Sequence, residues 1–206
     1  IALWLGEKNL TKEAHNIGAV NCIFKDENGI LKGTNTDGAA ALKCLENQLN
    51  NLKNKSIIQL GCGGAGRAVA AYIAGNSIKL DIAARYRTEI DDFTKKINAS
   101  LLDWNNFVYQ LDDYDVIINT TSIGFQNIND SPLEQKDIKK LRKNKFFYDI
   151  IYDPCPSKLL LMAKASGHDI LDGLSMNLEQ AILGFDYATK GISDISVTSA
   201  SMQKVF

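Results

Sequence analysis

The chain has 206 residues, of which 45% are hydrophobic and 23% are charged, and its formal net charge is −1. This composition is ordinary for a globular protein, and a charge near zero provides no general attraction to nucleic acid or to an anionic membrane. No apolar run approaches the roughly 18 residues of a membrane span, and four scattered cysteines without a C-x-x-C pair indicate reduced thiols in the cytoplasm. We therefore expect neither a disulfide framework nor a metal site.

The first 50 residues predict a β-hairpin followed by a helix. Residues 19–25 (AVNCIFK) and 30–34 (ILKGT) are strand-like, and the Asn28-Gly29 pair between them is a strong turn signal. Residues 38–50 predict a helix. A two-stranded hairpin is not stable by itself, so we expect residues 1–50 to be the closing hairpin and linking helix of a second α/β domain that begins outside this sequence.

The next segment combines a strand, a glycine-rich loop and a helix. Residues 56–60 (SIIQL) predict a buried parallel strand, GCGGAG follows at 61–66, and an alanine-rich helix runs to residue 74. Gly61, Gly63 and Gly66 fit the G-x-G-x-x-G spacing, which allows a tight turn, close approach of a pyrophosphate and close packing of helix on strand. The N-terminus of such a helix binds anions. The alternative is a glycine-rich turn in an α/β protein without a nucleotide.

Strands and helices then alternate to the end of the chain. The pattern predicts strands at 78–84, 101–102, 115–119, 146–151 and 169–171, helices at 89–98, 156–166 and 174–190, and a polar, partly helical stretch from Ser131-Pro132. This order predicts a Rossmann-like, doubly wound parallel sheet over residues 51–172, with C-terminal helices over residues 173–206 that return toward the first domain. The basic run 136–145 lacks interleaved aromatic residues, so we interpret it as a solvated helix face and not as a nucleic-acid site.

The end of the second strand predicts the nucleotide. An acidic residue about 20 positions after the glycines binds the ribose of NAD, whereas arginine accommodates the 2′-phosphate of NADP. Here the strand ends in Ala84-Arg85-Tyr86-Arg87, and Asp81 lies in mid-strand, where it does not reach the ribose. Guanidinium groups bind phosphate bidentately, so NADP is favoured. The alternative is a pair of exposed loop charges.

Three further patches carry polar residues at positions where chemistry is possible. GAVN (18–21) places Asn21 in a predicted strand, NTDG (35–38) places Asp37 directly before a helix, and YDIIYDP (148–154) follows a parallel strand. Each has a structural alternative: Asp37 as a helix N-cap, Asn21 as a turn residue and Tyr152 as a packing residue. His15 and His168 have no partner pattern, and we assign them no role.

Taken in order, GAVN, NTDG, the glycine loop, NTTSIG, YDIIYDP and DGLSMNLEQA resemble the shikimate dehydrogenase family from about Gly18 to Ala188. The resemblance implies an NADP-dependent oxidoreductase of aromatic amino-acid biosynthesis that interconverts 3-dehydroshikimate and shikimate. It implies Asp37 as a catalytic residue, substrate contacts from Asn21, Asp37 and Gln180, and Tyr152 nearby. The cofactor-binding residues that it implies are Gly61, Gly63, Gly64, Ala65, Gly66, Arg85, Arg87, Thr120, Ser122, Ile150, Gly173 and Met176.

Two departures from the family pattern bear on activity. Family members carry Asn-Arg-Thr at the second strand tip, where this chain has Ala84-Arg85-Tyr86. The family's catalytic lysine and substrate-binding serine pair lie in an earlier segment, which has no counterpart here. We therefore expect this chain to be an incomplete, inactive portion that binds NADP and a small-molecule substrate, as a monomer or homodimer. The alternatives are a quinate/shikimate dehydrogenase and a non-catalytic NADP-binding regulatory module. A methylenetetrahydrofolate dehydrogenase is disfavoured by NTDG and by the GLxMxxxQ pattern of the last helix.

Overall fold

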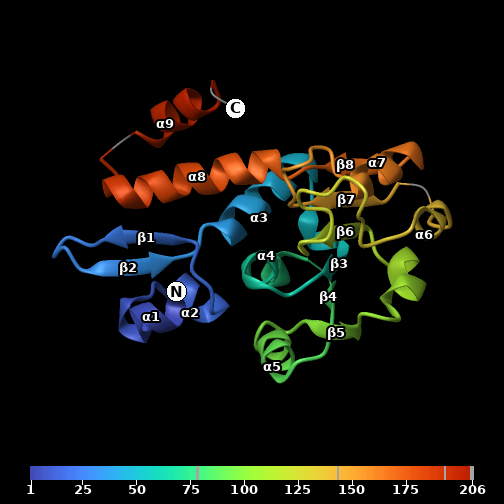
Figure 1. Ribbon diagram of the computed structural model, residues 1–206, viewed down its shortest axis with the longest axis horizontal. Helices are drawn as coiled ribbons and strands as arrows, with labels where there is room; N and C mark the ends of the chain where they lie inside the picture. Colours follow the sequence, from blue (N-terminus) through green and yellow to red (C-terminus); the bar gives the residue numbers. More distant parts are fainter. Residues whose placement is uncertain (78, 143, 193, 205–206) are drawn as a thin grey trace.

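A computed structural model describes residues 1–77, 79–142, 144–192 and 194–204. A parallel sheet with its helices forms one part, a two-stranded hairpin with short helices forms the other, and two long helices connect them (Figure 1). None of the helices in the described ranges has both the length and the apolar character that crossing a bilayer requires.

The large sheet has six strands in the order β5-β4-β3-β6-β7-β8. The strands are β3 (Ser56–Leu60), β4 (Lys79–Ala84), β5 (Ser100–Asp103), β6 (Val116–Asn119), β7 (Phe146–Asp149) and β8 (Asp169–Leu171). Every neighbouring pair is parallel, so all carboxyl ends meet at one edge. The strand order reverses direction between β3 and β6, where sheets of this kind bind ligands. The prediction of a Rossmann-like doubly wound sheet is confirmed.

Helices cover both faces of this sheet. One face carries α3 (Asp37–Gln48), α4 (Gly64–Ile73) and α5 (Thr88–Lys96), and the other carries η4 (Phe107–Asp113), α6 (Gln135–Lys139) and α7 (Lys158–Ala165). Successive strand residues point to opposite faces, so Ile57 belongs to the buried cluster that includes α4, while Ile58 belongs to the cluster that includes η4 and α7. Both are fully buried. Burying each stabilises the fold by about 1.5–3 kcal/mol, which explains why apolar runs identified these strands.

The hairpin consists of β1 (Cys22–Lys25) and β2 (Leu31–Thr34), which pair antiparallel with Cys22 opposite Thr34. Its turn is fixed by Asp26, whose Oδ1 accepts hydrogen bonds from the Asn28 and Ile30 N–H groups, both at 2.9 Å. Short helices α1 (Ala2–Leu5), η1 (Glu7–Asn9) and α2 (Lys12–Ile17) lie beside it (Figure 1). The remaining short elements are η2 (Leu52–Asn54) and η3 (Ala74–Asn76).

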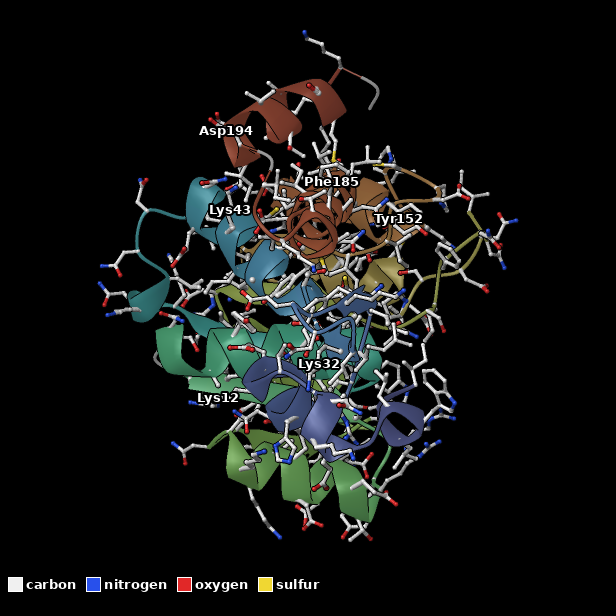
Figure 2. All side chains as sticks on the ribbon, turned by 90° about the vertical axis from the view of Figure 1, so that its left-hand side faces the viewer. Lys12, Lys32, Lys43, Tyr152, Phe185 and Asp194 are labelled. Carbon is white, nitrogen blue, oxygen red and sulfur yellow. The ribbon has the colours of Figure 1, made fainter. Side chains whose placement is uncertain are left out.

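Helix α8 (Leu174–Thr189) returns from the sheet along α3 and reaches β1, and α9 (Ile195–Met202) packs on it (Figure 1). Lys43 of α3, beside α8 in Figure 2, forms a 2.7 Å ion pair with Glu179. The Lys43 side chain is 58% exposed, so this pair contributes at most about 1 kcal/mol. The buried cluster that includes Leu45 of α3 and Met176 of α8 holds the two helices more strongly.

Several predicted boundaries were wrong for local reasons. Asn21 lies before β1 and not inside a strand, because its side chain bonds across to Thr36. The helix predicted to start at Pro156 begins at Lys158, because the Ser157 hydroxyl caps it by accepting from the Leu160 N–H. The predicted start of the second strand, Ile78, lies outside the described residues.

The basic run was only partly a solvated helix face. Helix α6 covers Gln135–Lys139 alone, and Lys143 lies outside the described residues. Lys145 is buried, and its Nζ donates hydrogen bonds of 2.7 Å to the carbonyls of Asp112 and Tyr114. This lysine therefore fastens the start of β7 to the end of η4.

His168 is a buried titratable group at the edge of the sheet. It lies between α7 and β8, is 5% exposed, and its ring centroid is 5.3 Å from that of Phe147. Burial lowers its pKa below the usual 6.5; the Ile138 backbone and Asp169 oppose this shift, and Lys145 adds to it. Because the folded state disfavours the charged ring, its contribution to stability is complete above pH 6.5 and is lost as the pH falls below that value.

We predict that lowering the pH from 7.5 to 5.5 reduces the free energy of unfolding of the chain relative to that of a His168→Phe variant, because the contribution of Asp149 is common to both proteins. Urea unfolding of both proteins at the two pH values measures the difference. His15→Phe, at an exposed position of α2, is the matched control and should follow the unsubstituted chain. The same pH dependence in His168→Phe and in the unsubstituted chain would show that His168 is not the titrating group.

Candidate functional site

A cleft of about 700 Å³ opens at the carboxyl edge of the sheet, beside the point where the strand order reverses. Residues that follow β3, β4, β5 and β6 line it, and none of them is acidic. The lining residues are Gly61, Cys62, Gly63, Gly64, Ala65, Ala84, Arg85, Arg87, Ile90, Trp104, Thr120, Thr121, Ser122 and Ile123.

The glycine loop brings the backbone of α4 to this cleft. Gly61 has φ of +95°, which favours glycine, and a Cβ there would lie 2.8 Å from Cγ2 of Thr121. A Cβ on Gly66 would lie 2.7 Å from Oγ1 of Thr120, so the missing side chain lets α4 pack closely on the loop after β6. The structure has the tight turn predicted at Gly61 and the close packing predicted at Gly66.

The N-terminus of α4 is open toward the cleft. A Cβ on the N-cap residue Gly63 would meet no atom within 4 Å, and no side chain caps the helix. The Arg67 N–H donates to the Gly63 carbonyl at 2.8 Å, which begins the helical hydrogen bonding. The N–H groups of the first turn, at Gly64 and Ala65, have no intrahelical acceptor and favour an anion.

The tip of β4 supplies positive charge. Arg85 and Arg87 are exposed and line the cleft. Asp81, the nearest carboxylate on that strand, is 3% exposed, forms a 2.8 Å ion pair with Lys79 and accepts a hydrogen bond from the Tyr114 hydroxyl. As predicted, Asp81 is committed within the strand, so the charge at the tip is carried by guanidinium groups.

Nine of the twelve predicted cofactor residues lie in or directly under this cleft; Gly66, whose close packing is described above, is the one that lies under it. The remaining three, Ile150, Gly173 and Met176, are not among its lining residues. They lie beyond β7 and β8, where a Cβ on Gly173 would be 2.1 Å from the Ile150 carbonyl oxygen and Met176 is buried. Their proposed role toward a cofactor stays a prediction.

Trp104 and Ile90 line the cleft but were not predicted. Trp104 follows β5 and packs on Phe107 with ring centroids 5.1 Å apart. The sequence feature that could have identified Trp104 is a large aromatic residue directly after a predicted strand of a parallel sheet. Its importance depends on β5 lying beside β4, which the sequence does not specify.

Asn21 and Asp37 form a second polar cluster between the hairpin and α3. The Asn21 amide donates to Asp37 Oδ1 at 2.8 Å and to the Thr36 hydroxyl at 3.0 Å, and it accepts from the Thr36 N–H at 2.9 Å. The structural alternative for Asp37 was wrong: the N-cap residue of α3 is Thr36, and Asp37 is the first helical residue. Its side chain bonds across the chain instead of capping the helix.

Asp37 is a partly desolvated carboxylate. Burial raises its pKa, and the hydrogen bond from Asn21 opposes that rise. No positive charge from the described part of the chain contributes to its pKa. Asp37 therefore has an acceptor oxygen that is oriented by Asn21 and free of an ion pair.

The two other predicted substrate residues lie on different elements, Gln180 on α8 and Tyr152 in the loop after β7. Gln180 and Gly184 share one face of α8, and Gly184 lies against Cys22, the neighbour of Asn21. The Gln180 amide donates to the Asn177 carbonyl at 3.0 Å. Tyr152 is 43% exposed and packs edge-on against Phe125, on the other side of α8 from Lys43 in Figure 2. The structure shows no contact of either residue with Asp37.

A buried carboxylate shapes the loop that carries Tyr152. Asp149, at the end of β7, accepts hydrogen bonds from the Ser157 hydroxyl at 2.6 Å, from the Asn119 amide at 3.0 Å and from the Ile151 N–H at 3.1 Å. Burial raises its pKa to about 6, and these donors oppose the rise. Asp149 thus ties β6, β7 and α7 together at the carboxyl edge.

A second cavity of about 600 Å³ lies between the end of the hairpin and the end of α8. Phe24 and Tyr187 form one side of it, with ring centroids 5.0 Å apart. None of the predicted site residues lines it.

Comparison with known proteins gives concordant matches. The family described as shikimate/quinate 5-dehydrogenase matches residues 43–153. The NADP(+) shikimate dehydrogenase of Bacillus licheniformis is 36% identical over 185 residues, which are 87% of this chain and 65% of that protein. The chain thus spans about two thirds of the length of such relatives.

Solved structures with the same fold include two enzymes with bound nucleotides. Shikimate 5-dehydrogenase of Thermus thermophilus, in complex with NADP(H) and shikimate, has a TM-score of 0.78 and 25% identity, and the match covers 96% of this chain and 72% of that one. Quinate dehydrogenase of Corynebacterium glutamicum, in complex with NAD, has a TM-score of 0.80 and 27% identity, with coverage of 95% and 71%.

We predict that Asn21→Ala raises the pKa of Asp37 further, because the substitution removes the hydrogen bond that opposes the effect of burial. The shift of the Asp37 carboxyl carbon signal with pH, followed by NMR, measures this pKa. Asn16→Ala, at an exposed position of α2, is the matched control and should leave it unchanged. An Asp37 pKa that stays the same in Asn21→Ala would contradict the prediction.

Proposed function

This chain belongs to the shikimate/quinate 5-dehydrogenase family, and we propose that it contributes to the reduction of 3-dehydroshikimate to shikimate with NADPH. The observation that supports the proposal most is that the chain holds both an anion-binding cleft and a polar cluster suited to a substrate hydroxyl. The anion-binding cleft lies at the end of β3, and the Asn21–Asp37 cluster lies where α3 leaves the hairpin. Four free cysteines agree with a reducing cytoplasm, where we expect the protein to act.

The cleft fits NADP better than NAD. The first turn of α4 offers N–H groups to a pyrophosphate, and its open N-cap leaves room for one. Arg85 and Arg87 offer guanidinium groups to a 2′-phosphate, and no carboxylate lines the cleft to bind a ribose hydroxyl. Trp104 and Ile90 provide apolar surface for the adenine. The relatives include complexes with NADP(H) and with NAD, so membership of the family does not fix the nucleotide. The preference for NADP is therefore argued from Arg85 and Arg87 of this chain.

NADPH, when bound in the cleft, would supply hydride to the carbonyl carbon of the substrate, and the carbonyl oxygen would take up a proton. Asp37, held by Asn21, accepts a hydrogen bond from a substrate hydroxyl and thereby orients the ring. Gln180 and Tyr152 contribute further hydroxyl contacts from α8 and from the loop after β7. An ionised carboxylate is a poor proton donor, so the proton comes from another group, which the family resemblance identifies as a lysine.

Quinate is the second candidate substrate. The likeness to the Corynebacterium glutamicum quinate dehydrogenase is as close in fold as that to shikimate dehydrogenases. Quinate has one more hydroxyl than shikimate and a saturated ring carbon at that position. Turnover of each substrate by the whole protein distinguishes the two candidates.

We predict that the chain binds NADP⁺ more tightly than NAD⁺, and that Arg85→Ala removes most of this preference. A hydrogen bond to a charged group contributes about 1.5–3 kcal/mol, which corresponds to a change of roughly tenfold or more in the dissociation constant. Calorimetric titration with both nucleotides measures the preference. Arg142→Ala, which breaks a distant pair with Asp112, should leave it intact. Equal affinity of the chain for both nucleotides would refute the NADP assignment.

We also predict that the 206-residue chain binds NADPH but does not oxidise it with 3-dehydroshikimate above the background rate. The reason is that the lysine which the family resemblance implies as the proton donor has no counterpart in this sequence, and an ionised Asp37 is a poor donor by itself. Absorbance of NADPH, followed with and without substrate, measures turnover. Sustained oxidation that requires the substrate would mean that another residue supplies the proton.

A further inference from the structure

Gln59 is a buried amide inside β3, one residue before the strand ends. Its neighbours in the strand are apolar, and it is 0% exposed. Its neighbours Ile58 and Leu60 point to the face covered by η4 and α7, so Gln59 points to the opposite face, which α4 covers. A buried polar side chain in a parallel strand is stable only when its hydrogen bonds are made, so its partners show what it does.

Both partners of the Gln59 amide belong to the glycine loop and α4. Nε2 donates to the Gly61 carbonyl at 2.9 Å and to the Gly66 carbonyl at 2.9 Å. The Thr120 hydroxyl lies 3.1 Å from the Gly61 carbonyl and 2.9 Å from the Leu60 carbonyl. A side chain from β3 and one from the residue directly after β6 thus hold the inner side of the glycine loop.

Holding these carbonyls inward determines where the N–H groups point. In a trans peptide the C=O and N–H bonds point in opposite directions. The Gly61 carbonyl faces Gln59, so the Cys62 N–H faces away from it, toward the cleft that Cys62 lines. The bond to Gly66 fastens the first turn of α4, whose unpaired N–H groups face the same cleft.

The hydrogen bonds fix which end of the Gln59 amide faces the two carbonyl groups. Gln59 Oε1 is buried and has no hydrogen-bond partner among the described residues. Turning the amide over would place that oxygen against the two carbonyl oxygens, so the observed orientation is the one with attraction. The unpaired Oε1 of Gln59 lowers the free energy of unfolding, and an apolar residue at this position would not have this effect.

We propose that Gln59 is a positioning residue that aims the N–H groups of the glycine loop at the pyrophosphate of the dinucleotide. This inference rests on the proposed function. It also explains why residue 66 is glycine: a Cβ there would lie 3.3 Å from Gln59 Nε2 and 2.7 Å from Thr120 Oγ1. The two residues act as one unit, in which the amide needs the space that Gly66 leaves.

The test compares two ligands that use different parts of the cleft. NADP⁺ contains the pyrophosphate, whereas 2′-AMP presents the adenine and 2′-phosphate without it. Gln59→Met should weaken NADP⁺ binding by about fivefold or more, the effect of one hydrogen bond. It should leave the dissociation constant of 2′-AMP unchanged and the melting temperature equal or higher. Ile118→Met is the matched control, because Ile118 is the buried register partner of Gln59 on β6.

Gly66→Ala is a second, independent variant and should show the same selective loss, because its methyl group displaces both donors. Unchanged NADP⁺ affinity in Gln59→Met, or equal weakening of both ligands, would overturn the positioning role. An unsubstituted chain that binds neither ligand would instead overturn the proposed function, and the role of Gln59 with it.

Discussion

The close approach of α4 to the end of β3 and to the loop after β6 is the constraint on which the rest of the molecule depends. Gly61 turns the chain with a positive φ, and Gly66 lies where a methyl group would collide with Thr120. Larger side chains would push the helix away and turn its N-terminus from the edge of the sheet. Packing at these two positions therefore creates the anion site before any ligand is considered.

The same edge collects the other groups because the strands are parallel. Arg85 follows β4, Trp104 follows β5, and Ser122 follows β6, so one cleft receives a charge, an aromatic face and a hydroxyl from three strands. The Asn21–Asp37 cluster is positioned in a different way. Helices α3 and α8 extend from the sheet to the hairpin, and they carry Asp37 at one end and Gln180 along one face. The packing between these helices fixes the relation between the cleft and the hairpin.

The sequence predicted the sheet well because burial on both faces requires continuous apolar runs, and each run marked a strand. It predicted most of the cleft because the glycine spacing and the arginines act through the local backbone. Elements of four to seven residues, such as α1 and η4, were missed because so few residues show no helical period.

The remaining errors come from tertiary contacts. Asp37 was weighed as a cap, but its partner is Asn21, 16 residues away. Lys145 was taken for a surface charge, but the carbonyls of Asp112 and Tyr114 hold it inside. The role of Gln59 was not predicted, because the sequence of a strand does not show which groups will lie against an amide within it. Trp104 became part of the cleft only through the position of β5 beside β4.

The central claim is that the glycine loop and the strand tips around it bind a dinucleotide. The most direct measurement is a titration of the ¹⁵N-labelled chain with NADP⁺, followed by the amide signals of each residue. The account predicts that the largest shifts are those of Cys62, Gly63, Gly64 and Ala65, together with Arg85 and Ser122 at the neighbouring strand ends. Shifts confined to other parts of the chain, with the signals of residues 61–66 unmoved at saturation, would contradict it.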